Sequence, residues 1–291
     1  MKSKFKRIFP RATKQLKQLF GATSMRRYPV QSSTCFLSLA VLFNLFICSS
    51  TGCTDENVSE MRKNLGHQNK VRGIEINYQN DLKNTVKYLP HLHKLDELQI
   101  LLIGGYKFPA TELKHIWKTK QIVKLSIVST NFTSNDLAGI KELNNLRELK
   151  IDHNDIIDDT LFEHLAELSI EKITIENCAK ITGKNIDMLI KNDSLQELKL
   201  AGTNLNDDAT ISLAKMQQLR TLHVNETKIT DVGIKKLLEL VNVADLSLPN
   251  TNKENWVPFA KYALELRHKA RAEGKPTTPD NLAPFYQVFE K

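Results

Sequence analysis

The sequence predicts an α/β protein, a curved solenoid with a parallel β-sheet on its concave face and helices on its convex face. An apolar triplet recurs with a period of about 24 residues between positions 71 and 251, and a helix-like stretch follows each triplet. A basic and then apolar segment precedes the array. We therefore divide the chain into a signal peptide (1–53), a tether and N-terminal cap (54–70), about eight repeats (71–251), and a C-terminal cap helix and tail (252–291).

The leader has the parts of a secretory signal. Residues 1–35 hold nine of the 41 Lys and Arg residues and no Asp or Glu. A charge-free interval from Tyr28 to Thr54 follows, and its most apolar part is the run Phe36–Cys48. A basic region followed by a short apolar core is typical of a cleaved signal, whereas a membrane span needs about 20 apolar residues. The leader predicts export.

The leader ends at Gly52-Cys53, which resembles the lipobox of bacterial lipoproteins, although Ser50 stands where that family usually has Leu. The resemblance implies that Cys53 receives a diacylglyceryl group and becomes the new N-terminus. We therefore expect a lipidation site at Cys53 and a protein that is membrane-anchored at the cell envelope.

Two alternatives remain open for the leader. An uncleaved signal anchor would keep residues 1–35 in the cytoplasm and still export the rest. A mitochondrial presequence is the second alternative, because positions 1–34 are basic, acid-free and interspersed with apolar side chains. In that case the protein would be an assembly or structural factor at the mitochondrial inner membrane.

The charge of the body argues against nucleic acid as a partner. The 41 Lys and Arg residues less the nine of the leader leave 32, against 33 Asp and Glu residues. Phosphate backbones are bound by clustered basic side chains, and the body has no excess of them.

The repeat unit is L-x-x-L-x-L. Its copies follow one another at a nearly constant spacing, which is longest between the second and third, at Val71/Ile74/Ile76, Leu95/Leu98/Ile100, Ile122/Leu125/Ile127, Leu146/Leu149/Ile151, Ile170/Ile173/Ile175, Leu195/Leu198/Leu200, Leu219/Leu222/Val224 and Val243/Leu246/Leu248. A fixed period of this length indicates a solenoid.

One full unit, Leu219–Asn242, indicates how each repeat folds. Leu222 and Val224 alternate with polar residues as in a strand, and Thr230 or Asp231 then caps a helix with Ile234, Leu237 and Leu238 on its apolar face. The pattern resembles the leucine-rich repeat superfamily in its cysteine-containing, ribonuclease-inhibitor-like subtype. The resemblance implies an inward ladder of small polar side chains and a binding scaffold; the ladder residues are Thr130, Asn154, Cys178, Thr203, Thr227 and Thr251.

The longest gap between triplets, from Leu98 to Leu125, predicts an insertion near Ile103–Pro109. Insertions in solenoids form loops on one face, often the binding face. Tyr106 and Phe108 are therefore either partner anchors or residues that pack beneath the loop.

The C-terminal region predicts a cap. Pro258–Glu273 forms an amphipathic helix that ends at Gly274, with an apolar stripe formed by Phe259, Tyr262, Ala263, Leu266 and Ala270. The tail that follows carries Phe285, Tyr286 and Phe289, which either pack back on the cap or bind a partner.

No catalytic, cofactor or metal site is predicted. His91 and His93 lack a third ligand at a suitable spacing. Asp152–Asp155 begins like a calcium loop, but Ile156 and Ile157 stand where an oxygen ligand and a glycine are needed. The segment Gly183–Asn185 departs from a phosphate loop at its last residue. We therefore expect a protein that is not an enzyme.

The predicted partner-binding surface is the concave sheet, where the residues between the buried positions point outward. The column Lys124-Glu148-Lys172-Glu197 alternates in sign and is expected to neutralise itself. The next two columns, which also contain Thr174 and Ala201, cancel less neatly and supply the candidates: Lys150, Asp152, His153, Glu176, Lys199, His223, Asn225 and Glu226. The sequence thus predicts a binding scaffold for a protein or glycan partner at the cell envelope.

Overall fold

The computed structural model describes residues 37–38, 71–77, 86–249 and 256–277. The chain divides into two units, Met1–Thr34 and Cys35–Lys291, and every described residue belongs to the second. Cys53, the tether 54–70, Thr251 and the aromatic residues of the tail lie outside the described residues. No helix in the described ranges is both long enough and apolar enough to cross a membrane.

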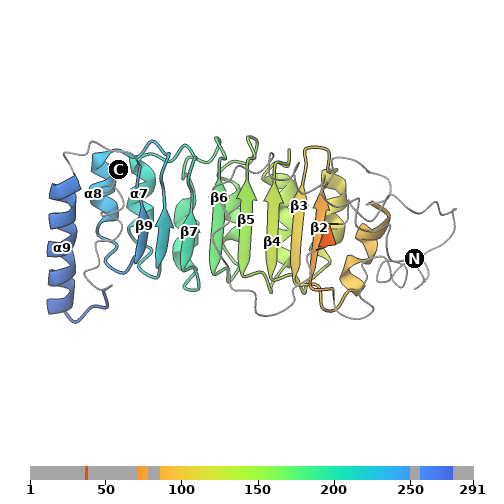
Figure 1. Cartoon of the computed structure of the whole chain (residues 1–291), viewed down its shortest axis with the longest axis horizontal. Helices are drawn as coiled ribbons and strands as arrows, with labels where there is room; N and C mark the ends of the chain where they lie inside the picture. The colour runs from red at the N-terminus through yellow and green to blue at the C-terminus, as the bar shows by residue number, and fades with distance from the viewer. Residues whose placement is uncertain (1–36, 39–70, 78–85, 250–255, 278–291) are drawn as a thin grey trace, which may run out of the picture. The chain divides into compact units, whose positions relative to one another are not determined.

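The described strands form one parallel sheet in which each strand pairs with the next along the chain (Figure 1). The strands are β1 (Leu37–Ser38), β2 (Gly73–Asn77), β3 (Ile100–Gly104), β4 (Lys124–Val128), β5 (Glu148–Asp152), β6 (Lys172–Glu176), β7 (Glu197–Lys199), β8 (Thr221–His223) and β9 (Asp245–Ser247). This order is the one expected when every repeat supplies one strand and returns through a helix.

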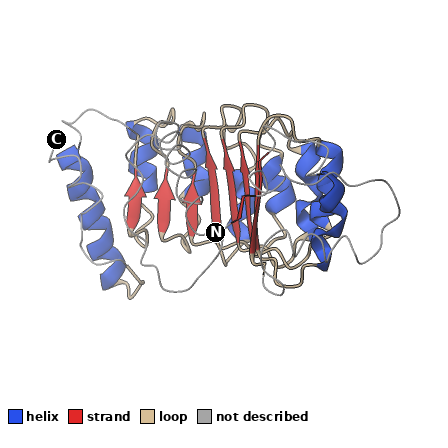
Figure 2. Cartoon of the chain, turned by 45° about the vertical axis from the view of Figure 1, so that its right-hand side comes forward, coloured by secondary structure: helices blue, strands red, loops and turns tan. Residues whose placement is uncertain are grey.

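Short helices return the chain from one strand to the next and lie together on one side of the sheet (Figure 2). They are η3 (Leu89–Lys94), η4 (Ala110–Glu112), α5 (Leu113–Trp117), η5 (Asn135–Glu142), α6 (Leu161–Leu165), η6 (Ile186–Lys191), α7 (Asp207–Leu213) and α8 (Asp231–Leu237). Of the two predicted capping residues, Thr230 is the N-cap of α8, and its side chain accepts a hydrogen bond from the Val232 N–H. The fold is an α/β leucine-rich-repeat solenoid.

The core lies between the sheet and the helices. The middle residues of the triplets stack in register, as in Leu125, Leu149 and Ile173, and all three are at most 1% exposed. Residues between them along each strand are exposed or half-buried, so that β4 alternates between the two faces. This alternation leaves one face of the sheet open, which we call the open face; it is the face predicted to be concave.

The predicted second triplet, Leu95/Leu98/Ile100, is wrong by three positions. Leu101 lies opposite both Ile74 and Leu125, so the second triplet is Leu98/Leu101/Ile103. The longest spacing therefore falls between β2 and β3, and the insertion predicted near Ile103–Pro109 does not exist. The segment Leu95–Ile103 satisfies L-x-x-L-x-L in two overlapping ways, and pairing with β4 selects the one that buries Ile103.

The inward ladder is confirmed at its described central positions. Asn154 is fully buried, and its amide donates to Thr130 Oγ1 and to the Phe132 carbonyl. Its Oδ1 accepts from the backbone N–H groups of Ile156 and Ile157 in its own loop. Thr203 Oγ1 donates to the Leu200 carbonyl at 2.7 Å. Cys178 is fully buried as well. These side chains satisfy loop backbone groups that burial would otherwise leave unpaired.

The cap helix α9 (Trp256–Ala272) begins two positions earlier than predicted, and Gly274 follows it in the left-handed conformation expected of a helix stop. Ala263 is buried, and Phe259, Tyr262 and Leu266 are partly buried against the core. The predicted apolar stripe therefore packs on the last repeat.

Candidate partner-binding face

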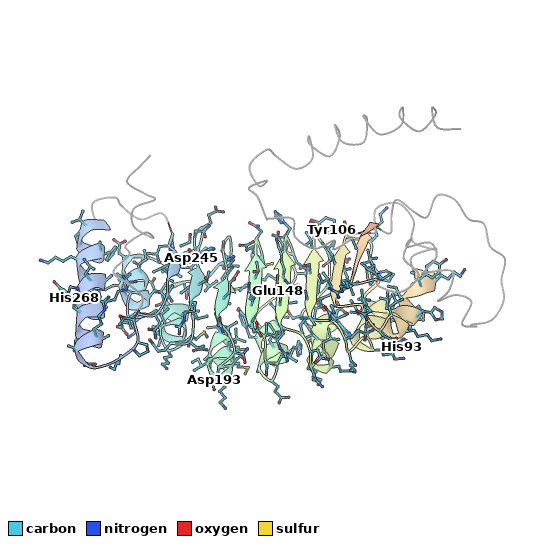
Figure 3. All side chains as sticks on the ribbon, turned by 60° about the horizontal axis from the view of Figure 1, so that its bottom comes forward. His93, Tyr106, Glu148, Asp193, Asp245 and His268 are labelled. Atoms are coloured by element: carbon cyan, nitrogen blue, oxygen red, sulfur yellow. The ribbon has the colours of Figure 1, made fainter. Side chains whose placement is uncertain are left out.

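The open face collects polar and charged side chains from neighbouring strands. Figure 3 shows Glu148 and Asp245 on strands of the sheet, with Tyr106 in the loop that follows β3. Because the strands are parallel and in register, equivalent residues form columns across the sheet. The register confirms the predicted neighbours Lys150, Thr174, Lys199 and His223 in one column, and Asp152 beside Glu176 in the next.

The first column neutralises itself, as predicted. Lys124 Nζ lies 2.6 Å from Glu148 Oε2, and Lys172 Nζ lies 3.5 Å from Glu197 Oε2. These pairs join adjacent strands of the sheet. They leave no net charge in this column between β4 and β7.

Asp152 is the centre of a polar cluster at the carboxyl end of β5. Its carboxylate lies 3.3 Å from Lys150 Nζ and 2.7 Å from His153 Nδ1, and it accepts a hydrogen bond from Asn177 Nδ2 at 3.0 Å. Burial alone would raise the pKa of Asp152, but the Asn177 hydrogen bond and the charges of Lys150 and His153 outweigh burial and lower it. We call these four residues the Asp152 cluster.

A second fixed pair lies on β7. Lys199 Nζ is 2.7 Å from Glu197 Oε1, and their side chains are only 28% and 22% exposed. Burial opposes both charges, yet the hydrogen bond and mutual attraction lower the pKa of Glu197 and raise the pKa of Lys199. Both groups are therefore charged at neutral pH.

His223, the remaining basic candidate, also has an acidic partner. His223 Nε2 lies 3.0 Å from Asp245 Oδ2, and beside it Asn225 Oδ1 accepts from Ser247 Oγ at 3.1 Å. Lys150, Lys199 and His223 therefore each have an acidic partner, and each partner lies in a neighbouring column. Two of these partners lie on the same strand as the basic residue.

Glu176 and Glu226 complete the predicted set. Glu176 is half-buried and lies opposite Asp152 in the register of β5 and β6, with no ion-pair partner in the described part of the chain. Glu226 is exposed at the edge of the sheet, where its φ is 57°.

Sequence reasoning missed Asn177, and it left open whether Tyr106 and Phe108 pack beneath the loop or bind a partner. Asn177 has a φ of 53°, and this left-handed geometry, which asparagine tolerates, is the only local signal of its role. Tyr106 is 63% exposed, whereas Phe108 is 2% exposed and stacks edge-on against Phe132 with ring centroids 5.6 Å apart. Phe108 therefore packs in the core, and Tyr106 points to solvent.

The chemistry available on the described residues is recognition by charge and hydrogen bonding. Within the described ranges, no three His, Cys, Asp or Glu side chains are placed to hold a metal ion. Burial raises the pKa of Cys178 to about 11, so its thiol is protonated at neutral pH. Its Sγ lies 3.2 Å from the Glu176 carbonyl oxygen, to which it donates as a ladder residue.

The fold and the open face together define a leucine-rich-repeat solenoid with a polar sheet surface. Among solved structures, the chain is similar to an internalin (inlF) from Listeria monocytogenes, with 17% identity, a TM-score of 0.45, and coverage of 66% of this chain and 65% of that one. It is also similar to an internalin C2 from the same species, with 21% identity, a TM-score of 0.41, and coverage of 56% and 69%.

A plant peptide hormone receptor, RGFR1 in complex with RGF2, is similar at 13% identity and a TM-score of 0.38, over 62% of this chain and 31% of the receptor. The chain thus spans less than two thirds of the length of the first internalin and about a third of the receptor. No family model and no curated protein matches the chain.

Proposed function

We propose that this protein is a non-enzymatic binding scaffold that is exported, anchored to a membrane through lipid on Cys53, and binds a protein partner at the cell envelope through the open face of β5–β8. The observation that carries the binding proposal is the set of charges that this face holds in place. The Asp152 cluster and the Glu197–Lys199 pair fix four charged strand side chains before any partner arrives. Export and anchoring are supported by the leader pattern of residues 1–53.

Fixed charges favour specific recognition. Ordering a long side chain at an interface costs roughly 0.5–1.5 kcal/mol, and a side chain already held by its neighbour avoids much of that cost. Since each basic group has an acidic partner, the face offers an alternating pattern of charge and not a field of one sign. Such a pattern selects a partner with complementary groups at matching spacing.

The contact is expected to be moderate in affinity. The open-face residues of β5–β8 include no Trp or Tyr, the side chains that most often dominate binding energy. We expect a Kd on the order of micromolar, which corresponds to about −8 kcal/mol. Added salt should weaken the complex, because exposed charges are screened within about 8 Å at physiological ionic strength.

Capture from envelope extract with a charge-reversed variant tests the proposal. Lys150→Glu/Lys199→Glu/His223→Ala should lose the partner that the parent retains. The matched control, Lys191→Glu/Lys215→Glu/His93→Ala, makes the same chemical changes at exposed residues off the open face and should keep it. A folded open-face variant that retains the same partner would show that the proposed face is wrong, and a captured glycan in place of a protein would show that the partner class is wrong.

A further inference from the structure

A groove opens on the helix side at the C-terminal end of the array, between α7, α8 and α9. Its volume is about 380 Å³, and its walls include Ile211, Val232, Lys235 and Tyr262. Ile211 and Val232 are 52% and 74% exposed, which is unusual for large apolar side chains on adjacent helices. Clustered exposed apolar side chains mark a contact surface.

The cap helix forms one wall of this groove but does not fill it. Lys235 Nζ lies 5.3 Å from the centroid of the Tyr262 ring, so α8 and α9 are in contact here. Tyr262 remains half-buried at this contact. The cap helix α9 therefore covers the end of the solenoid and leaves this groove beside it. Ile211, Val232 and Tyr262 form the apolar part of its lining, and the charged residues are Asp207, Asp208, Lys235, Lys236 and Glu239.

The chain turns back immediately after α9. The Gly274 N–H donates to the Arg271 carbonyl and the Lys275 N–H to the Ala270 carbonyl, both at 2.9 Å. Arg271 Nε then donates to Thr277 Oγ1 at 3.0 Å. The last described residues bend from the end of α9 toward the side on which the repeats lie (Figures 1 and 2). The chain thus leaves the described region heading back along the cap.

The segment that follows matches the groove in length and composition. Residues 278–291 contain five large apolar or aromatic residues, Leu282, Phe285, Tyr286, Val288 and Phe289. An extended chain covers up to about 3.3 Å per residue, so 278–285 can reach about 26 Å. The distance to cover along α9, from Arg271 back to Tyr262, is about 14 Å at 1.5 Å per residue.

We propose that the C-terminal segment 278–291 folds back into the groove between α7, α8 and α9 and seats Phe285 and Tyr286 against Ile211 and Val232. The segment completes the cap of the solenoid in cis. This inference concerns a different surface from the open face and stands whether or not the proposed partner site is correct.

Thiol labelling of the full-length chain tests the proposal. Ile211→Cys is compared with Met188→Cys, a 39% exposed apolar residue on the helix side but outside the groove. Peptide mapping by mass spectrometry reads each site separately, so the native cysteines do not interfere. The docked segment should slow labelling at position 211 at least about tenfold relative to position 188.

The triple substitution Phe285→Ala/Tyr286→Ala/Phe289→Ala should then restore fast labelling of Ile211→Cys and leave Met188→Cys unchanged. Equal labelling of the two sites in the intact tail would overturn the proposal. Protection that disappears on dilution would assign the groove to a second copy of the chain. Protection of Ile211→Cys that survives the triple substitution would show that another segment fills the groove. Each of these three results contradicts docking of residues 278–291.

Discussion

Left-handed backbone residues follow the strands from β3 to β8 at the same edge of the sheet. They are Gly105, Ser129, His153, Asn177, Gly202 and Glu226, with φ of 101°, 51°, 53°, 53°, 66° and 57°. A residue with a Cβ pays about 1–2 kcal/mol for this conformation. At Gly202 there is also no room for a side chain, since an added Cβ would lie 2.6 Å from Asn177 Oδ1.

Glu226→Gly should therefore stabilise the fold by about 1 kcal/mol, because glycine adopts a positive φ without steric cost. The measurement is the free energy of unfolding from urea titration. Glu226→Ala is the control, since it removes the carboxylate but keeps the Cβ, and it should give no gain. A glycine variant no more stable than the alanine variant would refute strain at this residue.

At the residue scale the sequence predicted burial better than pairing. Cys178 follows from the repeat register alone, because the equivalent residues are small or polar and those at Thr130, Asn154 and Thr203 are buried. The ion pairs within a strand did not follow from the sequence, since the prediction considered only pairs between neighbouring strands. Lys150 with Asp152 and Glu197 with Lys199 pair within one strand, where residues two apart share a face.

Among the strands and helices, the sequence did not predict the register of β3 correctly. Leu95–Ile103 contains two overlapping copies of the repeat motif, and both Leu95 and Leu98 are buried, so composition does not distinguish them. A slip of three positions exchanges the inward and outward faces of the strand. Only the pairing of β3 with β2 and β4 fixes the register, and this pairing joins residues that are far apart in the sequence.

The loop after β3 gives a stability prediction. Phe108→Ala should lower the free energy of unfolding by about 3–5 kcal/mol, because it empties a core position that contacts Phe132. Tyr106→Ala should change it by less than about 0.5 kcal/mol, because the ring is exposed. Thermal melts of the two single variants measure both effects. Equal losses of stability would contradict the conclusion that Phe108 packs in the core and Tyr106 is exposed to solvent.

The first helical layer contains two titratable histidines, of which His91 is buried and His115 half-buried. His91 of η3 is 5% exposed, and its Nδ1 has no hydrogen-bond partner in the described part of the chain. Burial lowers the pKa of His91, and Lys94, His93 and Lys87 lower it further. Burial also lowers the pKa of His115 of α5, although Glu112 opposes this effect. Both histidines are therefore neutral in the folded protein at neutral pH.

Acid should destabilise this layer. A depressed folded pKa means that the unfolded chain binds protons first, so stability is full above the ordinary histidine value of 6.5 and falls as the pH drops below it. Between about pH 7.5 and about pH 5 the melting temperature should fall, and it should fall less in His91→Gln than in the parent. His93→Gln, exposed on the same element, is the control. A fall in melting temperature as large in His91→Gln as in the parent would show that His91 does not cause the loss of stability in acid.

At the scale of the whole molecule, the leader carries the prediction on processing. The parent should incorporate labelled palmitate and lose about 5–6 kDa of leader, at roughly 110 Da per residue, whereas Cys53→Ala should stay unlabelled and be unprocessed or soluble. Mass spectrometry and gel autoradiography measure both. A parent of unchanged mass that takes up no label would rule out lipidation at Cys53.

Outside Leu95–Ile103, the array was predictable because its period leaves only one way to bury the apolar triplets. The partner was not predictable, since the open face is free to vary without any effect on the core. The residues that we propose for binding therefore lie where the repeat imposes the least constraint.

Site-specific photo-crosslinking in cells tests whether the open face binds an envelope protein. A photoreactive amino acid replaces Thr174, which lies between Lys150 and Lys199 in the register of the open face, or Lys215, an exposed residue that follows α7 on the helix side. We predict a defined covalent adduct with an envelope protein from position 174 and none from position 215. Adducts from position 215 alone, or from neither position in a correctly exported protein, would contradict the assignment of the open face as the partner surface.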